Sequence, residues 1–62
     1  MTPLDMMNAM KGKNVLVQLK NGKEITGKLL SFDLNTNIGI ETKQGIQFIQ
    51  GGTLTTISEI KR

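Results

Sequence analysis

The chain has 62 residues, 37% hydrophobic and 21% charged, and contains two Phe but no Trp, Tyr, Cys or His. A chain of this length forms at most a single domain, residues 1–62, and its small aliphatic core can be supported neither by disulfides nor by the usual zinc ligands, which leaves oligomerisation as the way to stabilise it. The net charge of +3 permits a polyanionic partner without requiring one.

The first segment predicts a short helix. Thr2 is a suitable N-cap, Pro3 suits the first helical position, and Gly12 is a suitable C-terminal stop. Apolar side chains recur between them at helical spacing: Leu4, Met7 and Met10. We interpret this face as a packing face.

From residue 13 onward the hydrophobic period changes to two, as in a strand. Residues 14–20 form the first predicted strand and residues 23–32 the second. Asn21-Gly22 between them is a strong hairpin signal. We predict a type I′ turn there, which requires positive φ at both positions.

The second predicted strand carries apolar side chains on both faces. Ile25 and Leu29 share one face, Leu30 and Phe32 share the other, and Gly27 marks a bend or a close backbone approach. A strand of this kind suits a sheet that curls into a small barrel.

Three further strands are predicted at residues 38–42, 46–50 and 53–57, after a polar loop at 33–37 and a tight turn at 43–45. The predicted fold class is therefore all-β. It has a short N-terminal helix followed by a strongly bent five-stranded antiparallel sheet, a small barrel of the SH3-like kind.

The last two predicted strands indicate self-association. Ile46, Phe48 and Ile49 put apolar side chains on both faces of the fourth strand, and residues 53–57 combine high β propensity with little charge. Two such edges at opposite ends of one sheet can pair between copies and close into a ring.

The sequence lacks the parts of the common enzyme classes. Without His or Cys there is no imidazole base, no thiolate nucleophile and no usual zinc site. We therefore expect no enzyme, catalytic residue, metal, cofactor or small-molecule substrate. No apolar run approaches the roughly 20 residues of a membrane span, and the N-terminus lacks a signal-peptide pattern, which predicts a cytoplasmic protein with no membrane partner.

The order of these segments resembles the Sm and Sm-like (LSm) family, and most of all the archaeal Sm-like proteins. The first family motif matches, in chain order, the helix, Gly12-Lys13-Asn14-Val15, residues 19–23, Gly27, Ser31-Phe32-Asp33 and Asn37. The second matches residues 48–57, so that the resemblance extends from the helix through Ile57. It implies a helix that caps a bent five-stranded sheet, and a homo-oligomeric ring in which the fourth strand of one subunit pairs with the fifth strand of the next. By resemblance we expect a heptamer, with six or another number of subunits as alternatives.

The resemblance also implies that single-stranded, uridine-rich RNA runs around the inner rim of the ring. By motif position, Asn37 recognises the base, since an amide can donate and accept hydrogen bonds at once. Asp33 orders the same loop, and Gly51 belongs to a second loop that completes the pocket.

Asn35 and Gln50 complete the predicted RNA site but depart from the family pattern. Asn35 stands where an aromatic residue or His is usual, and Gln50 stands where Arg is usual. Because stacking on an aromatic ring is worth about 1–3 kcal/mol per base, we expect weaker binding here. Ordinary loop polarity explains both residues equally well.

The predicted function is that of a ring that binds single-stranded RNA as a scaffold or chaperone in RNA processing. Two alternatives stay open. A ring that acts only as a structural or protein-interaction scaffold is favoured by the missing aromatic residue and Arg. A monomeric SH3-like peptide-binding module needs an aromatic-lined groove, which two Phe and no Tyr or Trp make difficult to build.

Overall fold

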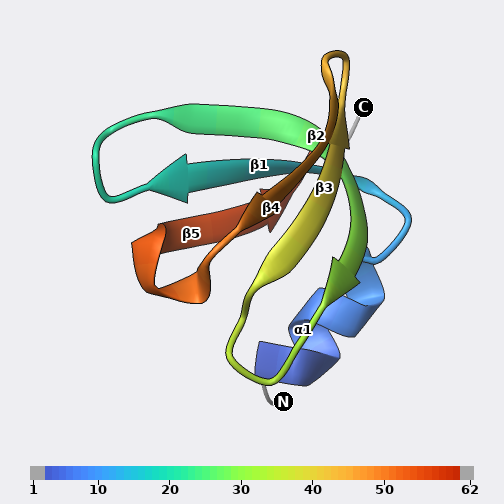
Figure 1. Cartoon of the computed structure of the whole chain (residues 1–62). Helices are drawn as coiled ribbons and strands as arrows, with labels where there is room; N and C mark the ends of the chain where they lie inside the picture. The colour runs from blue at the N-terminus through green and yellow to red at the C-terminus, as the bar shows by residue number, and fades with distance from the viewer. Residues whose placement is uncertain (1–2, 61–62) are drawn as a thin grey trace.

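A computed structural model describes residues 3–60 and shows a helix followed by five strands (Figure 1). The elements are α1 (Pro3–Met10), β1 (Asn14–Leu19), β2 (Glu24–Phe32), β3 (Ile38–Thr42), β4 (Gly45–Ile49) and β5 (Leu54–Glu59), with a 3₁₀ turn, η1 (Gly51–Thr53), before β5. All strand pairs are antiparallel. The predicted fold class is therefore confirmed. Within residues 3–60, no helix has the length and apolar character needed to cross a membrane.

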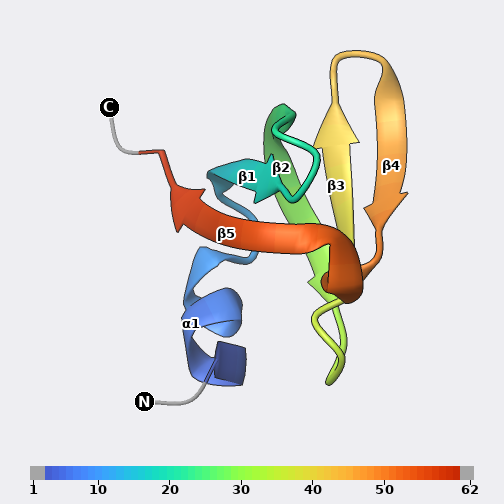
Figure 2. The same cartoon turned by 90° about the vertical axis from the view of Figure 1, so that its left-hand side faces the viewer.

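Helix α1 packs beside the sheet, below β5 in the view of Figure 2. Its Met7 and Met10 side chains are buried, as the helical spacing predicts. Gly12 has a φ of +83° and donates its N–H to the Leu29 carbonyl at 2.8 Å, which turns the chain from the helix toward β1. The predicted N-cap, Thr2, lies outside the described residues.

Strand β2 connects the two halves of the sheet. The strand order is β4-β3-β2-β1-β5. Residues 24–28 of β2 pair with β1 and residues 28–32 pair with β3, and the strand curves between the two partners (Figure 1). Gly27 lies at this change of partner, where a Cβ atom would collide with the Glu41 carbonyl oxygen. The predicted close backbone approach at Gly27 is confirmed.

The predicted faces of β2 are wrong at its C-terminal end. Leu29 pairs with Ile40 and Ser31 pairs with Gly39, so Leu30 is an extra residue in a β-bulge. Beyond a bulge the alternation of side chains shifts by one residue. Phe32 therefore packs against the core instead of facing away from it.

The core is aliphatic and small, as the composition requires. The buried hydrophobic side chains are Met7, Met10, Val15, Val17, Leu29, Ile38, Ile40 and Ile49. They come from the helix and from four strands, which fixes the bend of the sheet around one cluster.

The β1–β2 hairpin closes through a three-residue loop, so the predicted type I′ turn is wrong. Leu19 N–H donates to the Lys23 carbonyl at 2.9 Å, and Gly22 N–H donates to the Leu19 carbonyl at 3.0 Å. Gly22 has a φ of +86°, whereas Asn21 does not have positive φ. Asn21 instead accepts the Lys23 N–H on its side-chain Oδ1 at 3.0 Å. This pattern is typical of a type I turn followed by one left-handed residue.

Strands β4 and β5 form the two edges of the sheet, as predicted. Their bounds differ slightly from the predicted ones because the chain turns at residue 50. The Gln50 carbonyl accepts the Thr53 N–H at 3.0 Å and the Thr53 hydroxyl at 2.7 Å. These hydrogen bonds form η1, so that β5 begins at Leu54. On β4, Ile49 is buried, while Ile46 and Phe48 are 57% and 82% exposed.

Candidate functional site

The loop between β2 and β3, residues 33–37, has the same backbone hydrogen bonds as the β1–β2 loop. Asp33 N–H donates to the Asn37 carbonyl, and Thr36 N–H donates to the Asp33 carbonyl, both at 3.1 Å. Thr36 occupies the left-handed position, with a φ of +60°. A β-branched residue rarely adopts this conformation, so the surrounding contacts must hold it there.

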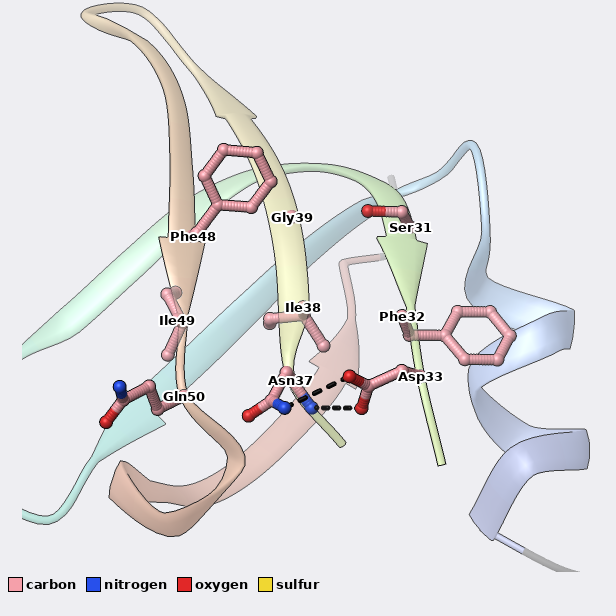
Figure 3. A pocket seen from close by; sticks show the side chains of 9 residues that line it. All are labelled: Ser31, Phe32, Asp33, Asn37, Ile38, Gly39, Phe48, Ile49 and Gln50. Carbon is pink, nitrogen blue, oxygen red and sulfur yellow. Dashed lines mark hydrogen bonds between the residues drawn. The ribbon is translucent and has the colours of Figure 1, made fainter. Parts of the chain in front are cut away.

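Asp33 organises this loop through its carboxylate. Oδ1 accepts the backbone N–H group of Asn35 at 2.8 Å. Asn37 donates twice, from its backbone N–H to Oδ1 and from its side-chain N–H to Oδ2, each at 3.0 Å (Figure 3). The hydrogen bond from the Asn37 side chain is the largest cause that holds the pKa of Asp33 below its ordinary value of 3.8. The two backbone N–H groups act in the same direction, and partial desolvation acts against them.

The Asn37 side chain connects two loops that are distant in sequence. Its Oδ1 accepts the Gly51 N–H at 2.7 Å, while its Nδ2 donates to Asp33. The two partners fix which end of the amide is oxygen and which is nitrogen. The loop after β2 and the turn after β4 are therefore joined through one side chain.

Gly51 is required at this junction because a side chain has no space there. A Cβ atom at Gly51 would collide with the Asn35 carbonyl oxygen and the Thr36 hydroxyl. At Gly52, a Cβ atom would have no neighbouring atom within 4 Å. The two adjacent glycines thus differ in their structural roles.

A shallow cavity of about 360 Å³ opens beside these loops. It is lined by Ser31, Phe32, Asp33, Asn37, Ile38, Gly39, Phe48, Ile49 and Gln50 (Figure 3). Three predicted site residues, Asp33, Asn37 and Gln50, meet in its wall. Asn35 and Gly51 do not line the cavity; the Asn35 carbonyl and Gly51 approach each other where the two loops touch.

Ser31, Gly39 and Phe48 line the cavity but were not predicted as site residues. The Phe48 ring lies over Gly39, where a Cβ atom would be 3.3 Å from the ring atom Cε1 and 2.7 Å from the Ser31 hydroxyl oxygen. The sequence signal available for Phe48 is its strand position between Gln47 and Ile49, which places it opposite the buried face.

The lining of the cavity combines apolar side chains with amide and carboxylate groups. Such a surface suits a planar ligand that has both an apolar face and a hydrogen-bonding edge. Among residues 3–60, no cluster of three or more acidic side chains is placed to hold a metal ion.

Comparison with known proteins identifies the family. Residues 5–59 match the LSM domain model. A protein of Thermococcus gammatolerans described as snRNP Sm-like is 40% identical over 50 residues, which cover 81% of this chain and 62% of that relative. The matched segment thus spans less than two thirds of the relative's length. The chain belongs to the LSM family, in agreement with the resemblance of its motifs.

Solved structures show the same architecture. The P. aerophilum SmAP1 heptamer has a TM-score of 0.91 at 29% identity, over 100% of this chain and 97% of that chain. The Sm protein of Pyrococcus abyssii, solved in complex with a uridine heptamer, has a TM-score of 0.88 at 28% identity, over 97% of this chain and 100% of that chain.

Proposed function

We propose that this protein forms a closed homo-oligomeric ring, a heptamer, that binds single-stranded, uridine-rich RNA and acts as a scaffold or chaperone in RNA processing. The observation that carries the proposal is the oriented amide of Asn37 at the wall of an open cavity. Family membership supports it, as do one relative solved as a heptamer and another solved with a uridine heptamer.

Ring formation is supported by the two unpaired edges of the sheet. Among residues 3–60, β4 pairs only with β3, and β5 pairs only with β1. Pairing of β4 with β5 of the next subunit would satisfy the unpaired backbone hydrogen-bonding groups of both edges.

The preference for uridine is supported by the fixed orientation of the Asn37 amide. Uracil presents an N–H donor and a carbonyl acceptor, whereas cytosine presents an acceptor and an amino donor at the same positions. A flip of the amide to suit cytosine would turn its NH₂ group toward the Gly51 N–H and its oxygen toward the Asp33 carboxylate. One N–H and one lone pair of the amide remain for the base.

The other predicted residues act around Asn37. Gln50 lines the same cavity and offers an additional donor and acceptor. Asp33 and Gly51 hold the Asn37 amide, and Asn35 contributes through its backbone, which contacts both the Asp33 carboxylate and the turn at Gly51. Each subunit would bind weakly, and affinity would arise from many subunits acting on one RNA strand.

One observation favours a ring without RNA binding. The Asn35 side chain, at the position where the family usually has an aromatic residue or His, does not line the cavity. This interaction scaffold remains the second candidate function. The absence of catalytic activity and the cytoplasmic location stay predictions.

Native mass spectrometry with and without an oligo-uridine tests the proposal, because it reports subunit number and RNA occupancy together. We expect a heptamer that binds one oligo-uridine at low salt. A monomer at micromolar concentration would contradict the ring, and a heptamer that binds no oligo-uridine would favour the interaction scaffold.

A further inference from the structure

We propose that Phe48 is a base-stacking platform, and that the RNA site extends from Asn37 along the outer face of β3 and β4 to the Phe48 ring. This inference rests on the proposed function and adds to it a residue that contacts RNA. The chain has two aromatic residues. Phe32 packs against the core, whereas Phe48 is 82% exposed.

The Phe48 ring is supported on one side and open on the other. It leans over β3 at Gly39, whose lack of a side chain leaves space for the ring (Figure 3). Ser31 lies beside the same point on β2. Contact with the strand below restricts the ring, so a base that stacks on its open face loses little additional side-chain entropy.

The ring and the uridine-recognition groups belong to one cavity. Phe48, Gly39 and Ile49 form apolar parts of its wall, and Asn37 and Gln50 form polar parts. A nucleobase needs an apolar platform for its face and hydrogen-bonding groups for its edge. The cavity supplies both, and its polar groups favour a base over an apolar side chain as the occupant.

Stacking on Phe48 is compatible with ring assembly. Phe48 pairs with Gly39 and Ile49 pairs with Ile38, so the Phe48 side chain lies on the face opposite the core. Pairing of β4 with a neighbouring subunit uses backbone groups that lie in the plane of the sheet. The phenyl ring points out of that plane and toward β3.

Stacking on Phe48 would compensate for the stacking that is lost because Asn35 replaces an aromatic residue or His. The family position that usually provides stacking is occupied here by an amide that does not line the cavity. An aromatic ring on β4 restores a stacking surface from another element. Stacking at this position also predicts that the RNA leaves the inner rim of the ring of subunits and crosses the outer face of β3 and β4.

Two variants of the full chain test the proposal with oligo-uridine as the probe, at one fixed salt concentration. Phe48→Leu keeps an apolar side chain but removes the aromatic face, and it should weaken oligo-uridine binding at least about five-fold. Phe48→Trp should bind as well as the parent, and its emission should be quenched when a base of the oligo-uridine stacks on the indole ring. Because the chain has no other Trp, any change in emission reports on position 48. Ile46→Leu is the matched control: it lies on the same strand, is exposed and is outside the cavity.

The outcomes separate this inference from the proposed function. If the parent binds oligo-uridine, while Phe48→Leu binds equally well and Phe48→Trp shows no change in emission, Phe48 is not a stacking platform and only the inference fails. If Phe48→Leu no longer assembles while Ile46→Leu does, Phe48 belongs to the subunit interface, and the inference fails. If the parent binds no oligo-uridine, both the proposed function and this inference fail.

Discussion

The two hairpin loops, residues 19–23 and 33–37, share a backbone hydrogen-bond pattern but are stabilised differently. In the first loop, Gly22 occupies the left-handed position, and the side-chain contact of Asn21 is local. In the second loop, Thr36 occupies that position, and Asn37 makes a hydrogen bond to Gly51, 14 residues along the chain.

The difference shows how a strained loop is maintained. Gly22 adopts positive φ without steric cost, so the backbone conformation of the first loop is favourable by itself, although Lys20 N–H also donates to the Thr53 carbonyl at 2.9 Å. Thr36 adopts an unfavourable conformation, which persists because Asp33 and Gly51 hold both sides of the loop. The strained loop is also the one that presents Asn37, so its rigidity serves the proposed recognition of uridine.

The largest expected effect comes from breaking the junction of the second loop. Gly51→Ala places a Cβ atom against the Asn35 carbonyl and the Thr36 hydroxyl, and it should lower the free energy of unfolding by about 1–3 kcal/mol. It should also weaken oligo-uridine binding, since the loop must shift. Gly52→Ala is the control and should leave both properties nearly unchanged, because its Cβ atom would meet no neighbour.

These free energies are measured by thermal or denaturant unfolding at equal subunit concentration, because assembly contributes to apparent stability. Equal effects of Gly51→Ala and Gly52→Ala would show that the loops are not coupled at this contact.

A β-branched residue in the first loop should lower the free energy of unfolding less than Gly51→Ala does. Gly22→Val places a β-branched side chain at a φ of +86° and should destabilise the protein by about 1–2 kcal/mol, because such a residue is strained at positive φ. The added Cβ atom meets no neighbouring atom, so no steric collision adds to this cost. Oligo-uridine affinity should stay unchanged at temperatures where the ring is folded. An unchanged melting temperature would contradict the requirement for a left-handed residue at this position.

The acid stability of the second loop should depend on Asp33. The pKa of Asp33 is lowered in the folded state, so its contribution is fully present above 3.8 and is lost as the pH falls through the lower folded value. The difference in melting temperature between the parent and Asp33→Asn should therefore shrink below pH 3.8. The corresponding difference for Asn21→Ala, in the first loop, should stay constant over the same range.

The smallest expected change in stability is that of Thr36→Gly. Relief of the left-handed strain, about 1–2 kcal/mol, is largely offset by the flexibility that glycine adds to the unfolded chain, roughly 0.5–1 kcal/mol. Denaturant unfolding should therefore show a net change below about 1 kcal/mol. A large loss of stability would show that the Thr36 side chain, and not the network around it, holds the loop.

Local patterns in the sequence were sufficient to predict the helix, the strands and the two open edges. The hydrophobic period reflects which face of each segment is buried, and turn residues mark where each segment ends. The turn type at Asn21 was not predictable, since Asn either adopts positive φ or bonds through its side chain. The bulge at Leu30, which turns Phe32 inward, depends on register with β3.

For the candidate site, the motif resemblance predicted Asn37 and Asp33, both of which line the cavity, but the contact of Asn37 with Gly51 is a tertiary hydrogen bond that no local pattern encodes. Phe48 was predicted as an edge residue. Its place in the cavity depends on Gly39, on the neighbouring strand.

The most direct test of the central claim compares the affinities of oligo-uridine and oligo-cytidine for the parent ring and for Asn37→Ala, at one salt concentration. We predict that the parent prefers oligo-uridine and that Asn37→Ala binds both RNAs equally, with the ring intact in native mass spectrometry. An equal preference for oligo-uridine in both proteins, or no preference in the parent, would contradict the assignment of Asn37 as the residue that recognises uridine.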